Sequence, residues 1–293
     1  MTKQTPFKLA GNIGNSDTLP IRTQFLIFTL FGDYVMERGG RIWTSDLLYL
    51  MERLGITERA VRSTLSRMAR KKWLSSRRKG RLSQYSLTAR GRALLEEGGQ
   101  RIFEPALMQW DGNWHLVLYS LPETRRAARH TLRTQLSWLG FGRMAAGAWI
   151  SPHRRSKELD GIFSDLKING NVHLFCGQYQ GFKTAKELVR QCWDLDDLAN
   201  HYRDFIARYE DEYQECCENH RRGRPLDPQF CFNRRFWLTH EFQGIPLKDP
   251  NLPPELLPSD WIGHTGRILF TNYRELLGTY ANQFVDDVIA EKS

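Results

Sequence analysis

The segment from Thr44 to Arg70 constrains the fold most, because its pattern predicts two short helices joined by a tight turn. The first helix starts at Thr44, whose hydroxyl is expected to cap the free amides of the first turn, and an apolar stripe runs to Leu54. Gly55 is expected to end this helix in the left-handed conformation, and Thr57 to cap the second. Two capped helices around a Gly-containing turn are typical of a helix-turn-helix.

The second helix has an apolar face and a basic face. At about 100° per residue, Val61, Leu65 and Met68 fall on one side, where they are predicted to pack into the core. The opposite arc carries basic residues and serines that can reach base edges in the major groove. The simpler alternative is that some of them contact phosphate only. The candidate DNA-binding residues on this arc are Arg59, Arg62, Ser63, Ser66, Arg67 and Arg70.

A short basic hairpin is predicted after the second helix. Leu82, Tyr85 and Leu87 indicate a return strand, and Gly80 lies where the chain needs a tight turn. A helix-turn-helix followed by such a hairpin is a winged helix-turn-helix. We expect the tip of the wing to contact the DNA backbone or the minor groove through Arg77, Arg78, Lys79 and Arg81.

The positive charge of the chain is concentrated in this region. From Arg59 to Arg92 the sequence has twelve Lys or Arg residues and no Asp or Glu. Because the whole chain has 42 basic and 33 acidic residues, the rest of the chain carries no positive excess. A concentrated basic patch is the electrostatic footprint of a phosphate-binding surface, although a lone charge run is more often a solvated face. Here the spacing, the caps, the hairpin and the charge agree, and we infer DNA binding.

The neighbouring segments supply the rest of a DNA-binding domain. An apolar helix is predicted to open at Thr18-Leu19-Pro20 and to stop at Gly39-Gly40. The residues Arg41–Trp43 are predicted to form a short strand that pairs with the wing. A further helix, Arg90 to Glu97, is predicted to end at Gly98-Gly99, where the basic excess also ends.

The middle of the chain alternates between strands and helices. Short apolar runs predict strands at Trp114–Tyr119, Ala145–Ile150 and Val172–Phe175. Helices are predicted from Pro122 to about Leu139 and around Glu158–Leu166. This rhythm, close to β-α-β-β-α-β, indicates a small ferredoxin-like domain.

The last third is predicted to be mostly helical. Apolar residues recur at spacings of three and four from Thr184 onward, and two more helices are expected at Phe230–Phe242 and Gly266–Ile289. Between these two helices, the Pro-rich stretch Gly244–Pro258 is expected to be an ordered loop. The predicted fold class is therefore α+β. The predicted parts are a mobile arm (1–17), a winged helix-turn-helix domain (18–98), a ferredoxin-like domain (110–180) and a helical domain (184–293).

The sequence resembles the PaaX family of bacterial transcriptional repressors over essentially the whole chain from about Thr18. The motifs that carry the resemblance are Gly39-Gly40-Arg41-Ile42-Trp43, the run from Glu58 to Met68, Trp110-Asp111-Gly112-Asn113-Trp114, His240-Glu241-Phe242, the run from Asp249 to Pro258, and Asp260-Trp261. The resemblance implies a homodimeric repressor of an aromatic-acid (phenylacetate) catabolic operon on a partly palindromic operator. It also implies release by an aryl-CoA thioester, phenylacetyl-CoA in the best-known members.

The middle domain is also similar to the small ferredoxin-like nuclease subunit of CRISPR adaptation complexes. Those proteins usually carry an Asp at the end of the first strand to hold a metal ion. Here the corresponding residue is Ser120, and a neutral hydroxyl does not replace a carboxylate as a ligand for a hard divalent cation. We therefore expect no nuclease activity, and a scaffold or dimerisation role instead.

An acyl-CoA effector needs basic residues for its phosphates and an apolar slot for its acyl group. A cluster on one predicted helix is the candidate for the phosphate side, although surface arginines of this kind are more often solvated or ion-paired. The members of this candidate effector-binding cluster are Arg125, Arg126, Arg129 and Arg133. Trp261 is expected to serve packing, with an aromatic contact to a ligand as the alternative.

No cofactor and no metal site are expected. The cysteines are five in number and form no Cys-x-x-Cys pair, as in a cytosolic chain with reduced thiols. His240 and Glu241 lack a second His at metal-site spacing, so a structural hydrogen bond is the simpler prediction. The sequence shows neither a signal-peptide hydrophobic region at Met1–Pro6 nor a membrane-spanning run, and we expect a cytoplasmic protein with no membrane partner.

Two alternatives remain beside the repressor. One is an enzyme, thioesterase-like or nuclease, that the basic segment tethers to nucleic acid. No set of nucleophile, base and orienting residue is visible in the sequence, which disfavours it. The other is an RNA-binding protein, which the winged pattern makes the weaker interpretation. Preference for duplex DNA over single-stranded RNA, and metal-dependent cleavage, are the observations that separate the three.

Overall fold

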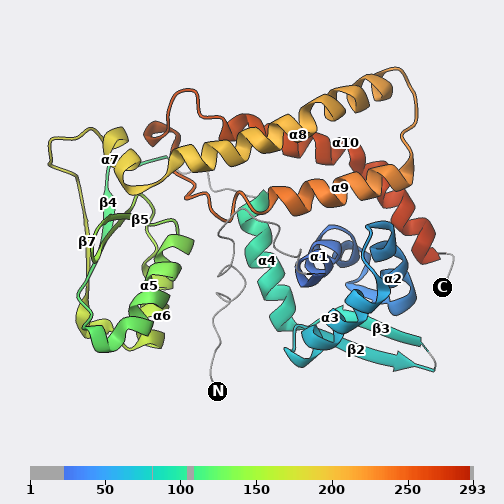
Figure 1. Cartoon of the computed structure of the whole chain (residues 1–293), viewed down its shortest axis with the longest axis horizontal. Helices are drawn as coiled ribbons and strands as arrows, with labels where there is room; N and C mark the ends of the chain where they lie inside the picture. Colours follow the sequence, from blue (N-terminus) through green and yellow to red (C-terminus); the bar gives the residue numbers. More distant parts are fainter. Residues whose placement is uncertain (1–22, 81, 104–108, 291–293) are drawn as a thin grey trace. The chain divides into compact units, whose positions relative to one another are not determined.

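The computed structural model describes residues 23–80, 82–103 and 109–290. The described residues form two compact units, each built from separate stretches of sequence: 23–80, 82–103, 203–244 and 264–290 in one, and 109–202 and 245–263 in the other. We call them the N-terminal unit and the central unit, and Figure 1 labels most of their helices and strands. The predicted arm at residues 1–17 and the predicted helix start at Thr18 lie outside the described residues.

The N-terminal unit begins with a helix, a strand, two helices and a two-stranded hairpin. Two helices followed by a hairpin agree with the order of elements expected from the sequence, and their assignment as a winged helix-turn-helix stays a prediction. The elements are α1 (Thr23–Leu30), a π-helical turn η2 (Phe31–Val35), a 3-10 turn η3 (Met36–Arg38), β1 (Arg41–Trp43), α2 (Thr44–Arg53), α3 (Glu58–Arg70), β2 (Leu74–Lys79), β3 (Leu82–Leu87) and α4 (Ala89–Phe103).

A three-stranded antiparallel sheet of order β1-β3-β2 joins the first strand to the hairpin. Ile42 pairs with Tyr85 on one side of β3, and Ser76 pairs with Tyr85 on the other. The predicted pairing of Arg41–Trp43 with the hairpin is therefore confirmed. Gly80 turns the hairpin at a φ of +61°, a conformation that favours glycine.

The helix α2 differs from the prediction at its start. Trp43 is its N-terminal capping residue and makes no side-chain cap bond. The hydroxyl of Thr44 instead donates to the carbonyl oxygen of Ser83, 2.8 Å away on β3. The prediction that Thr44 caps the helix was wrong, because a long-range bond to the sheet uses the same hydroxyl. Gly55 follows the helix at a φ of +81°, which confirms the predicted left-handed end.

The helix α4 also departs from the prediction, because it continues through Gly98-Gly99 to Phe103. Neither glycine adopts a positive φ. Ile102 is buried, and the ring of Phe103 stacks on Phe270 with 5.9 Å between centroids. These contacts stabilise the last turn of the helix, and packing of this kind overrides the weak helix propensity of two glycines.

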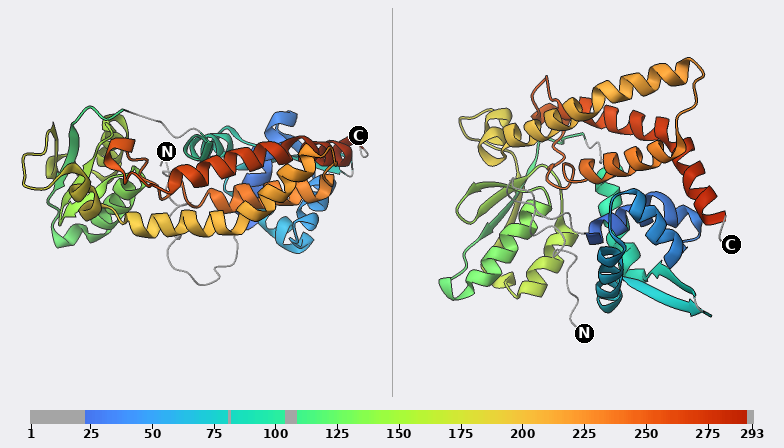
Figure 2. Two further views of the ribbon diagram at one scale, coloured as in Figure 1. Left: turned by 90° about the horizontal axis from the view of Figure 1, so that it is seen from above. Right: turned by 45° about the vertical axis from the view of Figure 1, so that its right-hand side comes forward.

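The C-terminal helices of the N-terminal unit are long and aromatic. They are α9 (Pro228–Phe242), α10 (Gly263–Ala290) and most of α8 (Leu195–Arg221). Figures 1 and 2 show α9 and α10 lying beside each other, and ring contacts join them. Phe242 stacks on Phe270 with 3.9 Å between centroids, and Phe232 contacts Phe284 at 5.2 Å. The predicted helices at Phe230–Phe242 and Gly266–Ile289 are confirmed, with α9 capped by Asp227.

The central unit holds a four-stranded antiparallel sheet of order β5-β6-β4-β7. With one helix before β5 and one before β7, this is the ferredoxin-like order, which confirms the prediction. A core of Val117, Trp149, Leu132 and Leu136 fills the space between the sheet and its helices. The elements are β4 (Trp114–Tyr119), η4 (Glu123–Arg125), α5 (Arg126–Trp138), β5 (Gly142–Ala145), β6 (Ala148–Ser151), α6 (Ser156–Leu166), η5 (Asn169–Asn171) and β7 (Val172–Gly177).

The single strand predicted at Ala145–Ile150 is wrong, since the chain turns there between β5 and β6. The turn needs Gly147, which has a φ of +75°, and a Cβ there would lie 2.5 Å from the carbonyl oxygen of Tyr119. Gly147 is the only residue in this apolar run that indicates a turn. The hydrophobic pattern of the run therefore did not show that it belongs to two strands, β5 and β6.

The helical stretch predicted from Thr184 onward is two helices. The first, α7 (Ala185–Cys192), starts at a capping box between Thr184 and Glu187. Trp193 then adopts an extended conformation before α8 begins at Leu195. The Pro-rich loop packs on the central unit and contains one 3-10 turn, η6 (Pro254–Leu256). Among the helices of the described residues, none is long and apolar enough to cross a membrane.

Candidate nucleic-acid interface

The helix α3 is fixed to its unit by one apolar face. Thr57 caps it as predicted, with its hydroxyl accepting from the amide of Ala60 at 3.4 Å. Val61, Leu65 and Met68 are at most 1% exposed, which confirms the predicted core face. The backbone and the buried face therefore hold α3 in one orientation, and its other face is presented to solvent.

The outward face of α3 gathers the side chains that sequence reasoning selected. All six of them are exposed: Arg59, Arg62, Ser63, Ser66, Arg67 and Arg70. Arg67 is steadied by a bond from its Nη2 to the hydroxyl of Thr64, 2.9 Å away. The structure thus brings these residues together on one surface, as DNA recognition requires.

Sequence reasoning missed one residue of this surface, Glu58 in the first turn of α3. Its Oε1 accepts from Nε of Arg62 at 2.6 Å, and both side chains are more than half exposed. Glu58 also lines a surface hollow between α2 and α3, with Tyr49 and Glu52 among the other lining residues. The signal was present in the sequence, since Glu58 and Arg62 have the spacing of four that places two helical side chains together.

The hairpin carries the second group of candidates. Arg77, Arg78 and Lys79 are exposed along β2, whereas Arg81 lies outside the described residues. Nε of Arg78 donates to the carbonyl oxygen of Gly80, 3.1 Å away, so this side chain also braces the turn. The hairpin therefore extends the positive surface of α3 with side chains that remain accessible to phosphate.

The base of the hairpin is held by α4. The hydroxyl of Thr88 donates to the carbonyl oxygen of Lys72 at 2.6 Å and accepts from the amide of Gly91 at 3.1 Å. Gly91 lies so close to the hairpin that a Cβ there would meet the carbonyl oxygen of Trp73 at 2.1 Å. Trp73 is itself buried and carries the ammonium group of Lys71 over its ring. This close approach fixes the position of the hairpin relative to α4.

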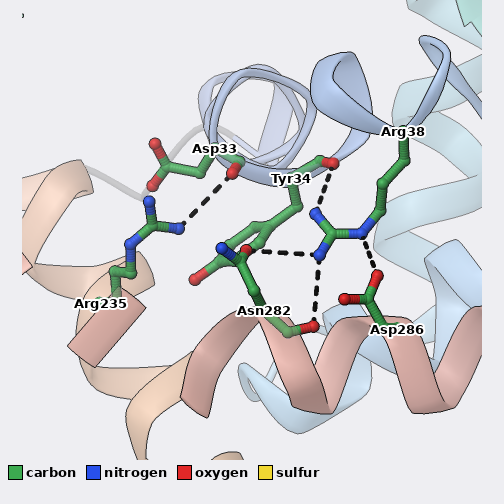
Figure 3. A network of polar contacts seen from close by, with 6 residues as sticks. All are labelled: Asp33, Tyr34, Arg38, Arg235, Asn282 and Asp286. Atoms are coloured by element: carbon green, nitrogen blue, oxygen red, sulfur yellow. Dashed lines mark hydrogen bonds and ion pairs between the residues drawn. The ribbon is translucent and has the colours of Figure 1, made fainter. Parts of the chain in front are cut away.

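A partly buried polar network joins the segment η2–η3 of the same unit to the helices α9 and α10, and Figure 3 shows part of it. Nη2 of Arg274 lies 3.0 Å from Oδ1 of Asp33, whose side chain is 3% exposed. Nε of Arg38 lies 2.7 Å from Oδ1 of Asp286. The guanidinium of Arg235 lies over the ring of Tyr34 at 5.1 Å. Local sequence patterns do not predict any of these contacts, because they join residues more than 190 positions apart.

The four candidate effector residues lie in the central unit, on η4 and α5. Arg129 is ion-paired with Glu123, and Nη1 of Arg125 donates to the carbonyl oxygen of Lys167 at 2.6 Å. Arg126 and Arg133 are exposed. Two of the four thus have partners within the protein, and the assignment of this cluster to a CoA phosphate stays a prediction.

The groups that suggest catalysis have structural partners. Nδ1 of His240 lies 2.7 Å from the amide nitrogen of Gln243, and burial lowers the pKa of His240 to about 4. Glu241 is instead paired with Arg208 at 2.6 Å. The predicted structural hydrogen bond of His240 is therefore confirmed. Burial raises the pKa of the Cys231 thiol to about 12 and that of Cys192 to about 11, so neither is a thiolate nucleophile at neutral pH.

Ser120 and Trp261, considered from the sequence for metal binding and ligand contact, lie in the central unit. Ser120 is exposed after β4, and its amide donates to the carbonyl oxygen of Asn171 at 3.1 Å. The ring of Trp261 packs edge-on against Tyr202, with 6.1 Å between centroids. Within the described residues, no group of three or more His, Cys, Asp or Glu side chains is arranged to hold a metal ion.

Comparison with known proteins divides the chain into three matched segments. Residues 22–91 match the model described as PaaX-like protein, residues 107–189 the PaaX protein central Cas2-like domain, and residues 193–287 the PaaX-like protein C-terminal domain. The chain is 32% identical over 274 residues to a curated protein of Escherichia coli (strain K12), Transcriptional repressor PaaX, covering 92% of this chain and 85% of that protein.

A solved structure shares the fold. The uncharacterized protein Rv0674 from Mycobacterium tuberculosis matches with a TM-score of 0.57 and 23% sequence identity. The match covers 83% of this chain and 90% of that one. At this identity the likeness concerns the fold alone.

Proposed function

The chain belongs to the PaaX-like family, and from this premise we propose that it is a transcriptional repressor that binds double-stranded operator DNA through α3 and the β2–β3 hairpin. The observation that carries the proposal is the exposed basic face of α3, which lies inside the matched segment 22–91. The regulated genes are those of phenylacetate catabolism, as the family resemblance implies.

In the proposed complex α3 lies in the major groove as the recognition helix of a winged helix-turn-helix. Its buried face leaves Arg59, Arg62 and Arg67 exposed on the side that would face the base edges, with the two serines as shorter donors. Arginine reads guanine through two parallel bonds to O6 and N7, and each such pair contributes about 1–3 kcal/mol of discrimination against other bases. Specificity is therefore assigned to α3.

The hairpin has a different role in the proposal. Arg77, Arg78 and Lys79 are exposed on a two-stranded ribbon, where they can follow the phosphate backbone or enter the minor groove. Contacts to phosphate release counterions and strengthen binding to any sequence, so their contribution falls steeply with salt. Affinity more than specificity is assigned to the hairpin.

The active species in the proposal is a homodimer on a partly palindromic operator. A two-fold dimer presents two copies of α3 to half-sites spaced by a turn or more of the double helix. The ferredoxin-like central unit is proposed as the scaffold of this dimer. A protein that reads operator DNA acts where that DNA lies, and we propose the cytoplasm.

Release is proposed to follow binding of an aryl-CoA thioester such as phenylacetyl-CoA. Arg125, Arg126, Arg129 and Arg133 are the proposed contacts for its phosphates. A ligand shifts an equilibrium only by its preference for one state over the other. The thioester must therefore bind a form of the dimer whose two copies of α3 no longer match the spacing of the half-sites.

A tethered enzyme is the second candidate function, and the described residues do not favour it. His240 is buried and bonded to Gln243, while Glu241 faces Arg208, so these neighbours do not act as an acid–base pair. Where the related nuclease carries an Asp, this chain has Ser120. We propose that the protein is not an enzyme and needs no cofactor.

The test is binding to a labelled fragment of the region upstream of the protein's own gene, at one fixed salt concentration. The complex of protein and fragment is titrated with phenylacetyl-CoA, and free CoA is the control for this ligand. Random duplex DNA and single-stranded RNA are the controls for the fragment. Specific binding that only the aryl thioester abolishes is the expected result. Binding that ignores the thioester contradicts the proposed effector. Equal binding to random duplex, or preference for RNA, contradicts the operator-binding function itself.

A further inference from the structure

Two of the three guanidinium nitrogens of Arg38 bond to α10 (Figure 3). Nε donates to Oδ1 of Asp286 at 2.7 Å, and Nη2 donates to the carbonyl oxygen of Asn282 at 3.2 Å. Nη1 donates to the carbonyl oxygen of Tyr34 at 3.0 Å. Asn282 and Asp286 lie one turn apart on the same face of α10. A planar, multiply bonded guanidinium has a single preferred position, unlike an exposed lysine.

Arg38 is also next to the strand that carries the hairpin. Only Gly39 and Gly40 separate it from β1, and the amide of Gly40 donates to the carbonyl oxygen of Val35 at 2.9 Å. The strand β1 pairs with β3 along its whole length, from Arg41 opposite Ser86 to Trp43 opposite Gln84. A shift of Arg38 is therefore expected to move the hairpin, because only Gly39, Gly40 and the strand β1 lie between them.

A second set of contacts holds the π-helical turn that precedes Arg38. Asp33 is paired with Arg274 of α10, and Nη1 of Arg235 from α9 points to the carbonyl oxygen of Asp33 at 3.5 Å. Among the described residues, Oδ2 of Asp33 and Nε of both arginines have no hydrogen-bond partner. A π-helical turn is rare and is frequently found at functional sites. A buried polar atom without a partner costs free energy, so this network is not at its most stable hydrogen bonding.

We propose that Arg38 is a positioning residue of the DNA-reading surface, by which α10 sets the place of β1 and the β2–β3 hairpin relative to α3. A movement of α10 then changes the fit of the hairpin to DNA, and DNA on the hairpin stabilises one position of α10 by the same free energy. The inference rests on the proposed function, because Arg38 would position part of the same DNA-binding surface. A structural ion pair without this role would change stability only.

The experiment uses the full chain and two neighbouring carboxylates of α10. Asp286→Asn removes the partner of Arg38, and its side chain is 62% exposed, so the variant is expected to fold. Asp287→Asn is the matched control, since it removes the same charge from an exposed side chain at the next position. Operator binding is measured for both variants and for the unchanged protein, each with and without phenylacetyl-CoA.

The expected result for Asp286→Asn is an operator affinity about 5- to 10-fold lower, with a response to phenylacetyl-CoA reduced by a similar factor. Asp287→Asn is expected to match the unchanged protein in both measurements. Equal behaviour of the two variants overturns the inference, even if both lose the same thermal stability.

Hydrogen exchange of the backbone amides, without DNA or ligand, separates failure of the inference from failure of the proposed function. Asp286→Asn is expected to speed exchange in β1 and β3 relative to Asp287→Asn, because β1 loses its anchor. Unchanged exchange in these strands overturns the inference. If the unchanged protein shows no operator preference, the proposed function fails, and the exchange comparison still decides whether Arg38 positions the hairpin.

Discussion

Nε of Arg62 lies 2.6 Å from Oε1 of Glu58, one turn earlier on the outward face of α3. The pair engages Nε of Arg62, so Nη1 and Nη2 are the atoms that can form two parallel bonds to guanine. Glu58 also places a negative charge in the first turn of α3, on an otherwise basic surface. In the proposed complex Glu58 therefore has two expected effects on specificity: it orients Arg62, and its charge opposes binding to phosphate at any sequence.

Replacing Glu58 with Gln is expected to lower the ratio of operator to random-duplex affinity by up to about tenfold. The variant loses the orientation of Arg62 and gains attraction to any phosphate. The matched control is Glu52→Gln, which removes a carboxylate from the same surface hollow. Competition binding at fixed salt measures the ratio, and an equal loss in both variants would falsify the orienting role.

Arginines of α3 and of the hairpin should respond differently to substitution. Arg62→Ala is expected to cost about 1–3 kcal/mol at one base pair of the operator and to relax selection there. Arg77→Gln is expected to weaken all duplexes alike and to reduce the slope of log affinity against log salt by about 1. Salt titrations on the operator and on its single-base variants measure both effects. Reversed outcomes would exchange the roles of helix and hairpin.

Two glycines of α4 provide a test of packing. A Cβ at Gly91 would lie 2.1 Å from the carbonyl oxygen of Trp73, whereas one at Gly98 meets nothing within 4 Å. Gly91→Ala is therefore expected to destabilise the protein by about 1–3 kcal/mol or more. Gly98→Ala is expected to stabilise it by about 0.5–1 kcal/mol, because alanine is the better helix former. Thermal unfolding of the two variants checks the opposite signs of the change in Tm.

The burial of His240 predicts a loss of stability in mild acid. Burial lowers its pKa from 6.5 to about 4, and its ring faces Thr29 and Gln243. Since the unfolded chain binds the proton first, this contribution is fully present above pH 6.5 and is lost as the pH falls towards 4.

By pH 5 the loss from this one group is about 2 kcal/mol. Urea unfolding at pH 7 and pH 5 measures it in the unchanged protein and in His240→Asn. The asparagine variant is expected to show the smaller difference between the two pH values. An identical difference in both proteins would mean that His240 does not titrate in this range.

The α3 surface was predictable from the sequence because its determinants are local. The cap at Thr57 and the apolar spacing of Val61, Leu65 and Met68 act within a few turns of one helix, and the absence of acids from Arg59 to Arg92 belongs to one continuous stretch of sequence. Such short-range patterns define a helix and its two faces before any tertiary contact forms. The same holds for the alternation of strands and helices that predicted the ferredoxin-like order.

Tertiary structure decided the elements whose stability comes from distant partners. Gly98-Gly99 do not end α4, because Phe103 packs on Phe270, and Thr44 does not cap α2, because Ser83 accepts its hydroxyl. Arg38 and Asp286 meet across 248 positions of sequence, where no local period relates them. A long-range contact is selected by the packing of the whole unit, and for that reason only the folded chain shows what holds the proposed DNA-binding surface in place.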